Sequence, residues 1–324
     1  MCTAFSLSAK SGHFFGRTLD LEFSYDECVC IMPRNYKLTF SNLQETEHHF
    51  AVIGMATVLD GYPLYYDGTN EKGLSAAALR FPEAKEYNFH KEGYINLASF
   101  EIIPYILSGF ETAKEAAAFL KNLNITNEGF SAELPPTPLH FLISDSESSF
   151  VLEQTDVLRI YENPACVLSN SPEFSYQLFN LNNYMSLSAK NKENTFSKDL
   201  KLQPYSHGMG AVGLPGDNSS VSRFVRCAFL KSCAKLSDKC EENINCFFHI
   251  LDSVCQIKGS NITDDEKCVI TVYSSCCDTK NLEYYYKTYE NPTINKVCLL
   301  NEDLSGKSLI SYPLILREEI KVQN

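Results

Sequence analysis

The chain of 324 residues is predicted to fold as an α+β protein, with antiparallel sheets covered by helices. Residues 3–56 alternate apolar and polar side chains, as strands with one buried face do. Further along, runs of strand-like sequence alternate with pairs of helical segments rather than with single crossover helices. Hydrophobic residues make up 44% of the chain, which is enough for a sizeable core. We expect one large domain over residues 1–324.

The strands are predicted from period-2 alternation bounded by turn residues. In the amino-terminal stretch the turn sequence SAKSG, at residues 8–12, separates two strands, and Cys2 stands at the edge of the first one. The later strands are expected over residues 51–55, 73–81, 139–144, 149–154, 157–161, 166–168, 267–273 and 282–289. The last of these is expected to close the chain.

The helices are predicted from their periodicity and their start signals. They are expected over residues 98–107, over residues 112–123, from Asn218 or Ser219 through the sequence VSRFVRCAFLKSCAK, and over residues 241–256. Pro104 interrupts the first helix, and a Thr112…Glu115 capping box opens the second. A polar connection through Leu200 is expected between the central strands and the third helix.

Charge and cysteine content exclude several classes of function. The chain has 28 Lys+Arg against 40 Asp+Glu, a formal net charge of -12, which repels nucleic acid and anionic membranes. It shows neither a signal-peptide pattern nor an apolar run of about eighteen residues, so we expect a cytoplasmic protein without a membrane partner. The 13 cysteines form no zinc-ligand spacing and are expected to be reduced thiols, with no metal bound.

Gly208 to Gly213 match the G-x-G-x-x-G pattern of dinucleotide-binding loops. That pattern functions only where the third glycine lies in a helix facing the pyrophosphate. Here Pro215 and Gly216 follow at once, so a helix cannot run through Gly213. We therefore expect a loop, and no cofactor.

Cys2 has unusual chemistry if the initiator Met1 is removed. Its thiol would then share a residue with a free α-amine, which makes a nucleophile with its own base. Arg17 and Asp20 follow on a strand-like stretch whose alternation puts them on opposite faces, unless a bend brings them together. Each of these residues alone is an ordinary terminal or surface residue, so composition and spacing leave the function open.

Several short segments, taken together, are more specific. They are the start MCT, GRTLD at residues 16–20, NEKGL at 70–74, LSN at 168–170 with Pro172, and GLPGD at 213–217 followed by SSVSRFVR at 219–226. This set resembles the choloylglycine hydrolase family, which comprises bile salt hydrolases and penicillin V acylases. The resemblance implies an amino-terminal nucleophile (Ntn) hydrolase with a four-layer αββα sandwich of two antiparallel sheets flanked by helices.

The resemblance also implies the roles of three residues near the start of the chain. Met1 would be removed, and Cys2 would attack the amide carbonyl to form a thioester acyl-enzyme that water hydrolyses. The Arg17 guanidinium would favour the Cys2 thiolate. The Asp20 carboxylate would lie against the Cys2 amine and orient it.

Three further positions match catalytic positions of the family. Asn170 would donate its side-chain amide to the oxyanion, and the backbone N–H of Arg80 would be the second donor. Arg223 resembles the supporting arginine beside the nucleophile. At the position of Arg80, bile salt hydrolases usually have asparagine and penicillin V acylases have tyrosine, so this residue leaves the choice of substrate open.

The family substrates are amides that join a steroid acyl group to glycine or taurine. An arginine at position 80 could pair with the carboxylate or sulfonate of such a conjugate, or it could point to solvent. A loop around His207 resembles the family's selector for the amino acid, although arginine is common at that position. Apolar candidates for the steroid wall are Leu19, Phe130, Leu134 and Leu139.

The prediction is therefore a cytoplasmic cysteine amidase that hydrolyses conjugated bile salts, as a homotetramer by family resemblance. A penicillin V acylase, or a hydrolase of other N-acyl amides, is the alternative within the class. A non-catalytic binding protein on the same scaffold is a second alternative. A third is a metal or redox module built on the cysteine cluster Cys233, Cys240, Cys246 and Cys255.

Overall fold

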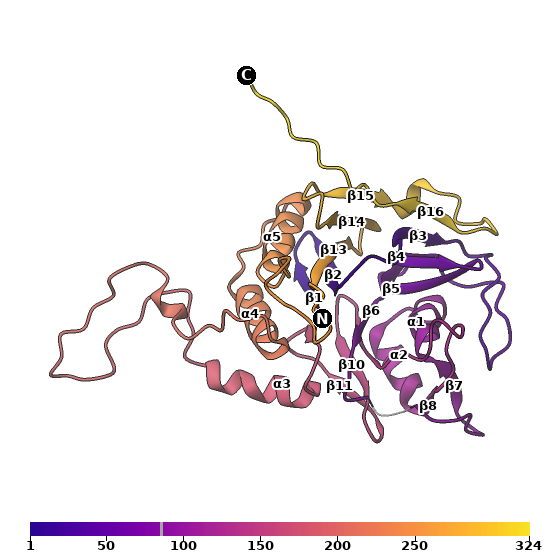
Figure 1. Cartoon of the computed structure of the whole chain (residues 1–324), viewed down its shortest axis with the longest axis horizontal. Helices are drawn as coiled ribbons and strands as arrows, with labels where there is room; N and C mark the ends of the chain where they lie inside the picture. The colour runs from indigo at the N-terminus through magenta and orange to yellow at the C-terminus, as the bar shows by residue number, and fades with distance from the viewer. Residues whose placement is uncertain (85–86) are drawn as a thin grey trace.

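Two large antiparallel sheets form the centre of the molecule (Figure 1). The computed structural model describes residues 1–84 and 87–324. The six-stranded sheet has the order β12 (Val167–Ser169), β1 (Cys2–Ala9), β2 (Gly12–Leu21), β13 (Ile270–Asp278), β14 (Glu283–Thr288) and β15 (Asn295–Cys298). The eight-stranded sheet has the order β11 (Leu158–Glu162), β10 (Ser149–Gln154), β9 (Leu139–Ser144), β6 (Ser75–Arg80), β5 (Tyr62–Asn70), β4 (Val52–Leu59), β3 (Cys28–Met32) and β16 (Ile310–Pro313).

Helices cover the outer face of each sheet, which gives four layers (Figure 1). The pair α4 (Ser220–Cys233) and α5 (Cys240–Asp252) packs on the six-stranded sheet. The pair α1 (Ile102–Gly109) and α2 (Ala113–Phe119) packs on the eight-stranded sheet. A small parallel pair, β7 (Ile95–Ala98) and β8 (Leu123–Thr126), lies beside α1 and α2. The predicted αββα sandwich of antiparallel sheets is confirmed.

The β1–β2 hairpin shows how strand alternation builds these layers. Phe5 of β1 points outward and stacks on Phe247 of α5, with the ring centroids 3.9 Å apart. Its neighbour Ser6 points inward and shares a hydrogen bond of 2.9 Å with Ser144 of the facing sheet. Both faces of the hairpin are buried, so its side chains alternate between two cores rather than between a core and water.

The helix starts follow the capping signals of the sequence. The Thr112 side chain accepts a hydrogen bond from the Glu115 amide at the start of α2, and Ser219 caps α4 through the Ser222 amide. Pro104 lies in the first turn of α1, where a backbone N–H would have no partner within the helix, so the missing N–H of proline does not interrupt the helix. Among the described residues, no helix is long and apolar enough to cross a bilayer.

Some elements were not expected. The strand β5 was missed because its inward residues Asp67 and Thr69, and Asn70 on its outer face, are buried polar residues that interrupt the apolar pattern. The strands β15 and β16 follow the strand that was expected to close the chain. A short helix, α3 (Phe174–Asn180), interrupts the connection predicted to be polar throughout.

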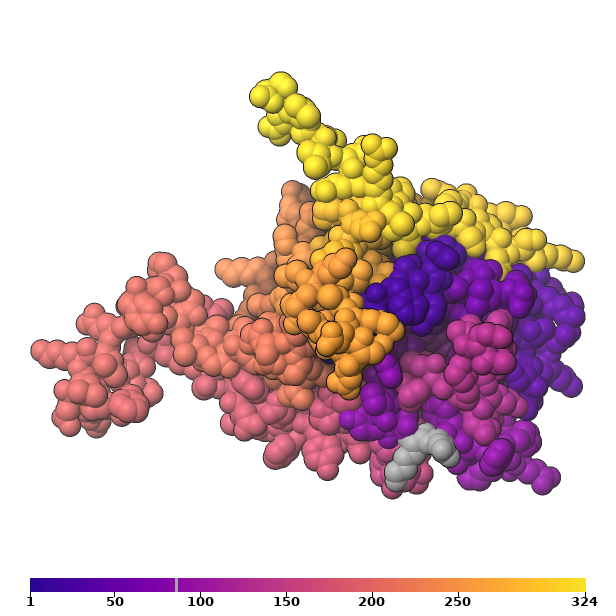
Figure 2. Space-filling model, in the orientation of Figure 1, coloured from indigo at the N-terminus to yellow at the C-terminus, as the bar shows by residue number. Residues whose placement is uncertain are grey.

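The rest of that connection forms an arm that projects from the body between η3 (Leu181–Tyr184) and η4 (Met209–Ala211) (Figures 1 and 2). The side chains on and at the root of the arm include exposed apolar groups: Met185, Phe196 and Tyr205 are 80%, 84% and 87% exposed. Leu200 and Leu202 are each 50% exposed as well, so apolar side chains face water along the arm.

His13 gives the fold a specific pH dependence. It lies on β2 with its Nδ1 atom 2.8 Å from Ser8 Oγ, and burial lowers the pKa of His13 to about 4, against the opposing effect of Asp145. In the unfolded chain its pKa is about 6.5, so between pH 6.5 and 4 the unfolded state binds the extra proton. The free energy of unfolding should therefore fall as the pH falls through this window.

We predict that His13→Gln removes this component. Between pH 7 and 4.5 the wild-type free energy of unfolding should decrease by about 2 kcal/mol more than that of the variant. Urea unfolding of both proteins at several pH values measures the difference. Parallel profiles for the two proteins would show that His13 does not remain neutral in the folded state.

Candidate active site

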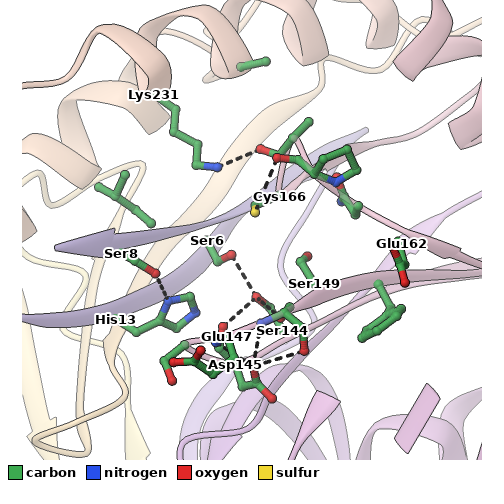
Figure 3. Close-up of a pocket in the computed structure, with 18 of the residues that line it drawn as sticks. Ser6, Ser8, His13, Ser144, Asp145, Glu147, Ser149, Glu162, Cys166 and Lys231 are labelled. Atoms are coloured by element: carbon green, nitrogen blue, oxygen red, sulfur yellow. Dashed lines mark hydrogen bonds between the residues drawn. The ribbon is translucent and has the colours of Figure 1, made fainter. Parts of the chain in front are cut away.

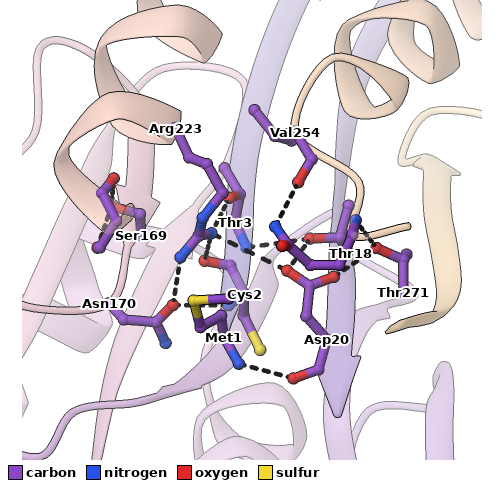
Figure 4. Close-up of polar contacts among 12 residues, drawn as sticks. Met1, Cys2, Thr3, Thr18, Asp20, Ser169, Asn170, Arg223, Val254 and Thr271 are labelled. Carbon is purple, nitrogen blue, oxygen red and sulfur yellow. Dashed lines mark hydrogen bonds and ion pairs between the residues drawn. The ribbon is translucent and has the colours of Figure 1, made fainter. Parts of the chain in front are cut away.

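Side chains from four elements meet at the start of β1 (Figure 4). Cys2 begins β1, Asp20 lies near the end of β2, Asn170 directly follows β12, and Arg223 lies in the first turn of α4. Because β1 pairs with both β12 and β2, residues far apart in sequence become neighbours of Cys2. Cys2 is 3% exposed and Arg223 is fully buried, so the cluster lies inside the protein.

Arg17 and Asp20 reach this region from opposite faces of β2. Arg17 points toward the eight-stranded sheet, where its Nη1 atom donates to the carbonyls of Tyr66, at 3.0 Å, and Ala78. Asp20 points toward α4, where Oδ2 lies 4.0 Å from Arg223 Nη1. No bend is needed, since strand alternation places one charge on each side of the hairpin.

Arg223 connects the cluster. Its Nη1 atom donates to the Cys2 carbonyl and the Thr3 hydroxyl, both at 2.5 Å, and its Nη2 atom donates to Asn170 Oδ1 at 2.8 Å. Burial lowers the pKa of Arg223, while Asp20 opposes this by stabilising the cation. One guanidinium therefore joins the start of β1 to the residue after β12.

Asp20 is held by hydroxyl donors as well. Thr271 of β13 donates to Oδ1 at 2.7 Å, and Thr18 donates to Oδ2 at 3.2 Å. Burial raises the pKa of Asp20, and the opposing influences are Arg223, the terminal amine and the Thr271 hydrogen bond. Neither threonine had been predicted, because a threonine in a strand carries no signal of such a contact.

Arg17 is a fully buried cation with an unused donor. Its Nε atom donates to the Thr18 carbonyl at 3.2 Å, and its Nη2 atom has no hydrogen-bond partner among the described residues. Burial opposes the charged form, but the charges of Cys2, Tyr273 and Asp67 outweigh it and raise the pKa of Arg17. Arg17 lies on the same face of the hairpin as Cys2, because Ala4 pairs with Arg17 and Cys2 with Leu19.

Met1 is attached to Cys2 in the structure and extends the hairpin. Its amine donates to the Asp20 carbonyl at 2.7 Å, and its carbonyl accepts from the Asp20 amide at 3.0 Å. The Cys2 nitrogen is therefore a peptide amide here. It donates to Asn170 Oδ1 at 2.6 Å rather than to the Asp20 carboxylate that the family resemblance implied.

Asn170 and Arg80 face each other across the two sheets. Asn170 Nδ2 donates to the Arg80 carbonyl at 2.7 Å. The backbone N–H of Phe81 donates to the Pro138 carbonyl beside β9. Because successive residues of an antiparallel strand direct their backbone groups to opposite sides, the N–H and the carbonyl of Arg80 both point away from β9. The β5 pairing ends at Ala77, so the Arg80 N–H points to the same side as Asn170. The Arg80 side chain is exposed.

The predicted substrate-binding residues are only partly brought together. Leu19 is buried next to Cys2, and half-buried Leu139 pairs with Arg80. Half-buried Phe130 contacts the rings of Tyr62 and Phe100, at 5.8 and 5.4 Å between centroids. The carbonyl of half-buried Leu134 accepts a hydrogen bond of 3.0 Å from the Phe130 amide, so these two residues lie together. His207 is exposed and lies in the arm, between η3 and η4.

A groove of about 1580 Å³ lies apart from this cluster (Figure 3). The residues that line it include Ser6, His13, Ser144, Ser149 and Lys231, but none of the predicted catalytic residues. All thirteen cysteines lie in the described part of the chain and are free thiols. Within residues 1–84 and 87–324, no three His, Cys, Asp or Glu side chains gather as metal ligands would.

Comparison with known proteins finds similarity along almost the whole chain. The family model of linear amide C–N hydrolases, choloylglycine hydrolase family, matches residues 2–312. A bile salt hydrolase/transferase of Lactiplantibacillus plantarum is 46% identical over 315 residues, with 97% of each chain covered.

Solved structures agree with this match. A variant of the conjugated bile acid hydrolase of Clostridium perfringens has a TM-score of 0.91 at 36% identity, with both chains fully covered. A penicillin V acylase of Agrobacterium tumefaciens has a TM-score of 0.73 at 21% identity, covering 96% of this chain and 90% of that one, and shares the fold. The resemblance seen in the scattered motifs is confirmed: this chain belongs to the choloylglycine hydrolase family of linear amide C–N hydrolases.

Proposed function

We propose that this protein hydrolyses the amide bond of glycine- or taurine-conjugated bile salts, with Cys2 as the nucleophile after removal of Met1. The observation that carries the proposal is the buried cluster in which Arg223 and Asn170 meet Cys2 at the start of the chain. The 46% identity to a bile salt hydrolase/transferase supports the choice of substrate.

Removal of Met1 would turn the Cys2 amide into an amine at the same place. The thiol would attack the substrate carbonyl while the α-amine accepts the thiol proton. The amine would then give this proton to the leaving nitrogen, so that glycine or taurine departs and the acyl group remains on sulfur as a thioester. Water, deprotonated by the same amine, would hydrolyse the thioester and regenerate the thiol.

Two groups are suited to support the charges of this reaction. Arg17 carries a permanent positive charge on the face of the hairpin that carries Cys2. Its Nη2 atom, which no residue of the described ranges 1–84 and 87–324 binds, would stabilise the thiolate. Asp20 lies on the other face, where it would balance the positive charge of Arg223 and of the new amine. A buried cation without such a partner would be strongly destabilising.

The oxyanion of the tetrahedral intermediate would take two N–H donors. Asn170 Nδ2 now donates to the Arg80 carbonyl and would exchange that acceptor for the substrate oxygen. The Arg80 N–H, directed to the same side, would be the second donor. This second role depends only on the backbone, so it is compatible with the arginine side chain.

The substrate contacts follow from the same positions. Leu19, Leu139, Phe130 and Leu134 would form the apolar wall for the steroid. The exposed Arg80 side chain would pair with the carboxylate or sulfonate of the conjugate. His207 lies in the projecting arm, between η3 and η4. It would contact the glycine or taurine end of the substrate where the arm folds over the site in the assembled protein.

We also propose a homotetramer that acts in the cytoplasm. The exposed apolar groups Met185, Phe196 and Tyr205 favour burial of the arm against other subunits. The thirteen free thiols suit a reducing compartment.

Amine release separates the substrate hypotheses. With Met1 removal verified by intact mass, we expect release from glycocholate and taurocholate, and loss of at least about 10³-fold in Cys2→Ala. The control Cys233→Ala, in the last turn of α4, should keep full activity. Release from penicillin V alone would support the acylase alternative, and a protein that retains Met1 would support a binding role. No release from any of the three by processed protein would reject the proposed substrate.

Asn170→Ala tests the oxyanion role. Loss of one donor should lower kcat about 10² to 10³-fold while KM changes less than about threefold, because the oxyanion exists only in the transition state. Steady-state kinetics with the preferred conjugate measure both constants, and Asn183→Ala, an exposed asparagine, is the control. An unchanged kcat would remove Asn170 from the oxyanion site.

Arg80→Asn tests the conjugate contact without removing the backbone donor. We expect kcat/KM to fall about two- to tenfold and unequally for the glycine and taurine conjugates, since an exposed ion pair is weak and the two anions differ in geometry. Arg80→Lys should recover part of the loss, because it keeps the charge but not the planar fork. Equal effects on both conjugates, or none, would leave Arg80 with no role in discrimination.

A further inference from the structure

Gln177 is buried inside the unexpected helix α3, only seven residues after Asn170. Its side chain is 1% exposed. Its Nε2 atom donates to the carbonyls of Asn170, at 2.5 Å, and Pro172, at 2.6 Å, and its Oε1 atom accepts from the Ser169 hydroxyl at 2.6 Å. Both amide hydrogens and the amide oxygen are therefore used on one segment of four residues, 169–172.

This segment needs an external support because it leaves the sheet. Ser169 is the last residue of β12 that pairs with β1, opposite Thr3. Beyond it, Asn170 and Pro172 lie outside the strand pairing of β12 and β1, and buried carbonyls without a hydrogen bond are costly. The side-chain amide of Gln177 donates a hydrogen bond to each of these two carbonyls.

The helix that carries Gln177 is itself fixed from the other side. The Phe174 amide, at the start of α3, donates to both carboxylate oxygens of Glu153 on β10, each at 3.0 Å. Glu153 also contacts His140 Nδ1 of β9 at 2.9 Å, and both side chains are buried. The Phe174 ring packs on Phe224 of α4, with the centroids 6.3 Å apart. Gln177 therefore extends from a helix held by the eight-stranded sheet and by α4.

The side chain of Asn170 is held at its far end by other groups. Oδ1 accepts from Cys2 and Arg223, and Nδ2 donates to Arg80. These contacts orient the side-chain amide, whereas the backbone carbonyl of Asn170 is bound by Gln177. A displacement of about 1 Å at a catalytic group can reduce the rate about 10²-fold.

We propose that Gln177 is a positioning residue, which sets the place of the Asn170 side-chain amide by binding the backbone carbonyls of Asn170 and Pro172. The inference rests on the oxyanion role proposed for Asn170. Gln177 does not touch the reacting atoms; it acts through Asn170 alone.

Gln177→Met is the test variant, since methionine keeps the length of the side chain but makes none of the three hydrogen bonds. We expect kcat to fall about 10- to 100-fold, with KM within about threefold of wild type. The matched control is Gln154→Met, a buried glutamine on β10 that is 4% exposed, and it should stay within about twofold in both constants.

A double-mutant cycle separates positioning from general damage. In the Asn170→Ala background, Gln177→Met should cost less than about threefold in kcat, because the group it positions is gone. A full, additive loss in that background would overturn the proposal. If Gln177→Met does not fold, as judged by thermal melting, Gln177→Glu replaces it. That variant keeps the acceptor for Ser169 and removes the two donors, and a wild-type kcat for it would also overturn the proposal.

Crystal structures of wild type and variant give a readout that does not depend on any substrate. We expect the 2.7 Å contact of Asn170 Nδ2 with the Arg80 carbonyl to be lost in the variant. An Asn170 side chain left in place would refute positioning by Gln177. A displaced Asn170, in a protein whose wild type releases no amine from conjugated bile salts, would reject the proposed substrate and leave the positioning role intact.

Discussion

The buried guanidinium of Arg223 is the interaction on which the site depends. It binds the Cys2 carbonyl, the Thr3 hydroxyl, the Asn170 side chain and the Asn218 carbonyl, and it faces Asp20. Removing a cation from water costs free energy unless hydrogen bonds and a nearby counter-charge compensate for the lost hydration. Those needs fix the relative positions of the first strand, the end of β12 and the start of α4. The geometry around Cys2 thus follows from the cost of burying one charge.

The layer between the two sheets continues this pattern. On the side away from α4, Arg17 lies in the sandwich with Asp67, whose carboxylate accepts from the hydroxyls of Tyr273, at 2.6 Å, and Tyr284, at 2.7 Å. A carboxylate held by two phenols in the interior offsets the charge of the arginine without pairing its guanidinium directly. Arg17 donates instead to backbone carbonyls. Its Nη2 atom has no partner within the part of the chain that the structure describes, and this suits a group whose partner would be the reacting sulfur.

The segments that leave the sheets decide the rest of the arrangement. The chain after β12 carries Asn170 and turns at once into α3, which ties this segment to Glu153 of the eight-stranded sheet. The chain after α3 runs into the exposed arm, far from the cluster in the isolated subunit (Figures 1 and 2). Cys2 therefore lies on a strand of the sandwich, whereas His207 lies on the exposed arm.

The sequence by itself determined the alternating strands of the sandwich, the capped helices and the family. Each of these can be predicted from neighbouring residues or from short motifs such as GRTLD and SSVSRFVR. Only the tertiary structure decided how Thr271 reaches Asp20, how Arg223 reaches Cys2, and how the charges of β2 act from opposite faces. These contacts join residues separated by 251 and 221 positions, and they depend on strand register, which no local pattern contains. The helix α3 and the strand β5 were missed for a related reason. Their buried polar residues, Gln177 and Asp67, are stabilised by partners from elsewhere in the chain, and no local hydrophobic pattern can reveal such partners.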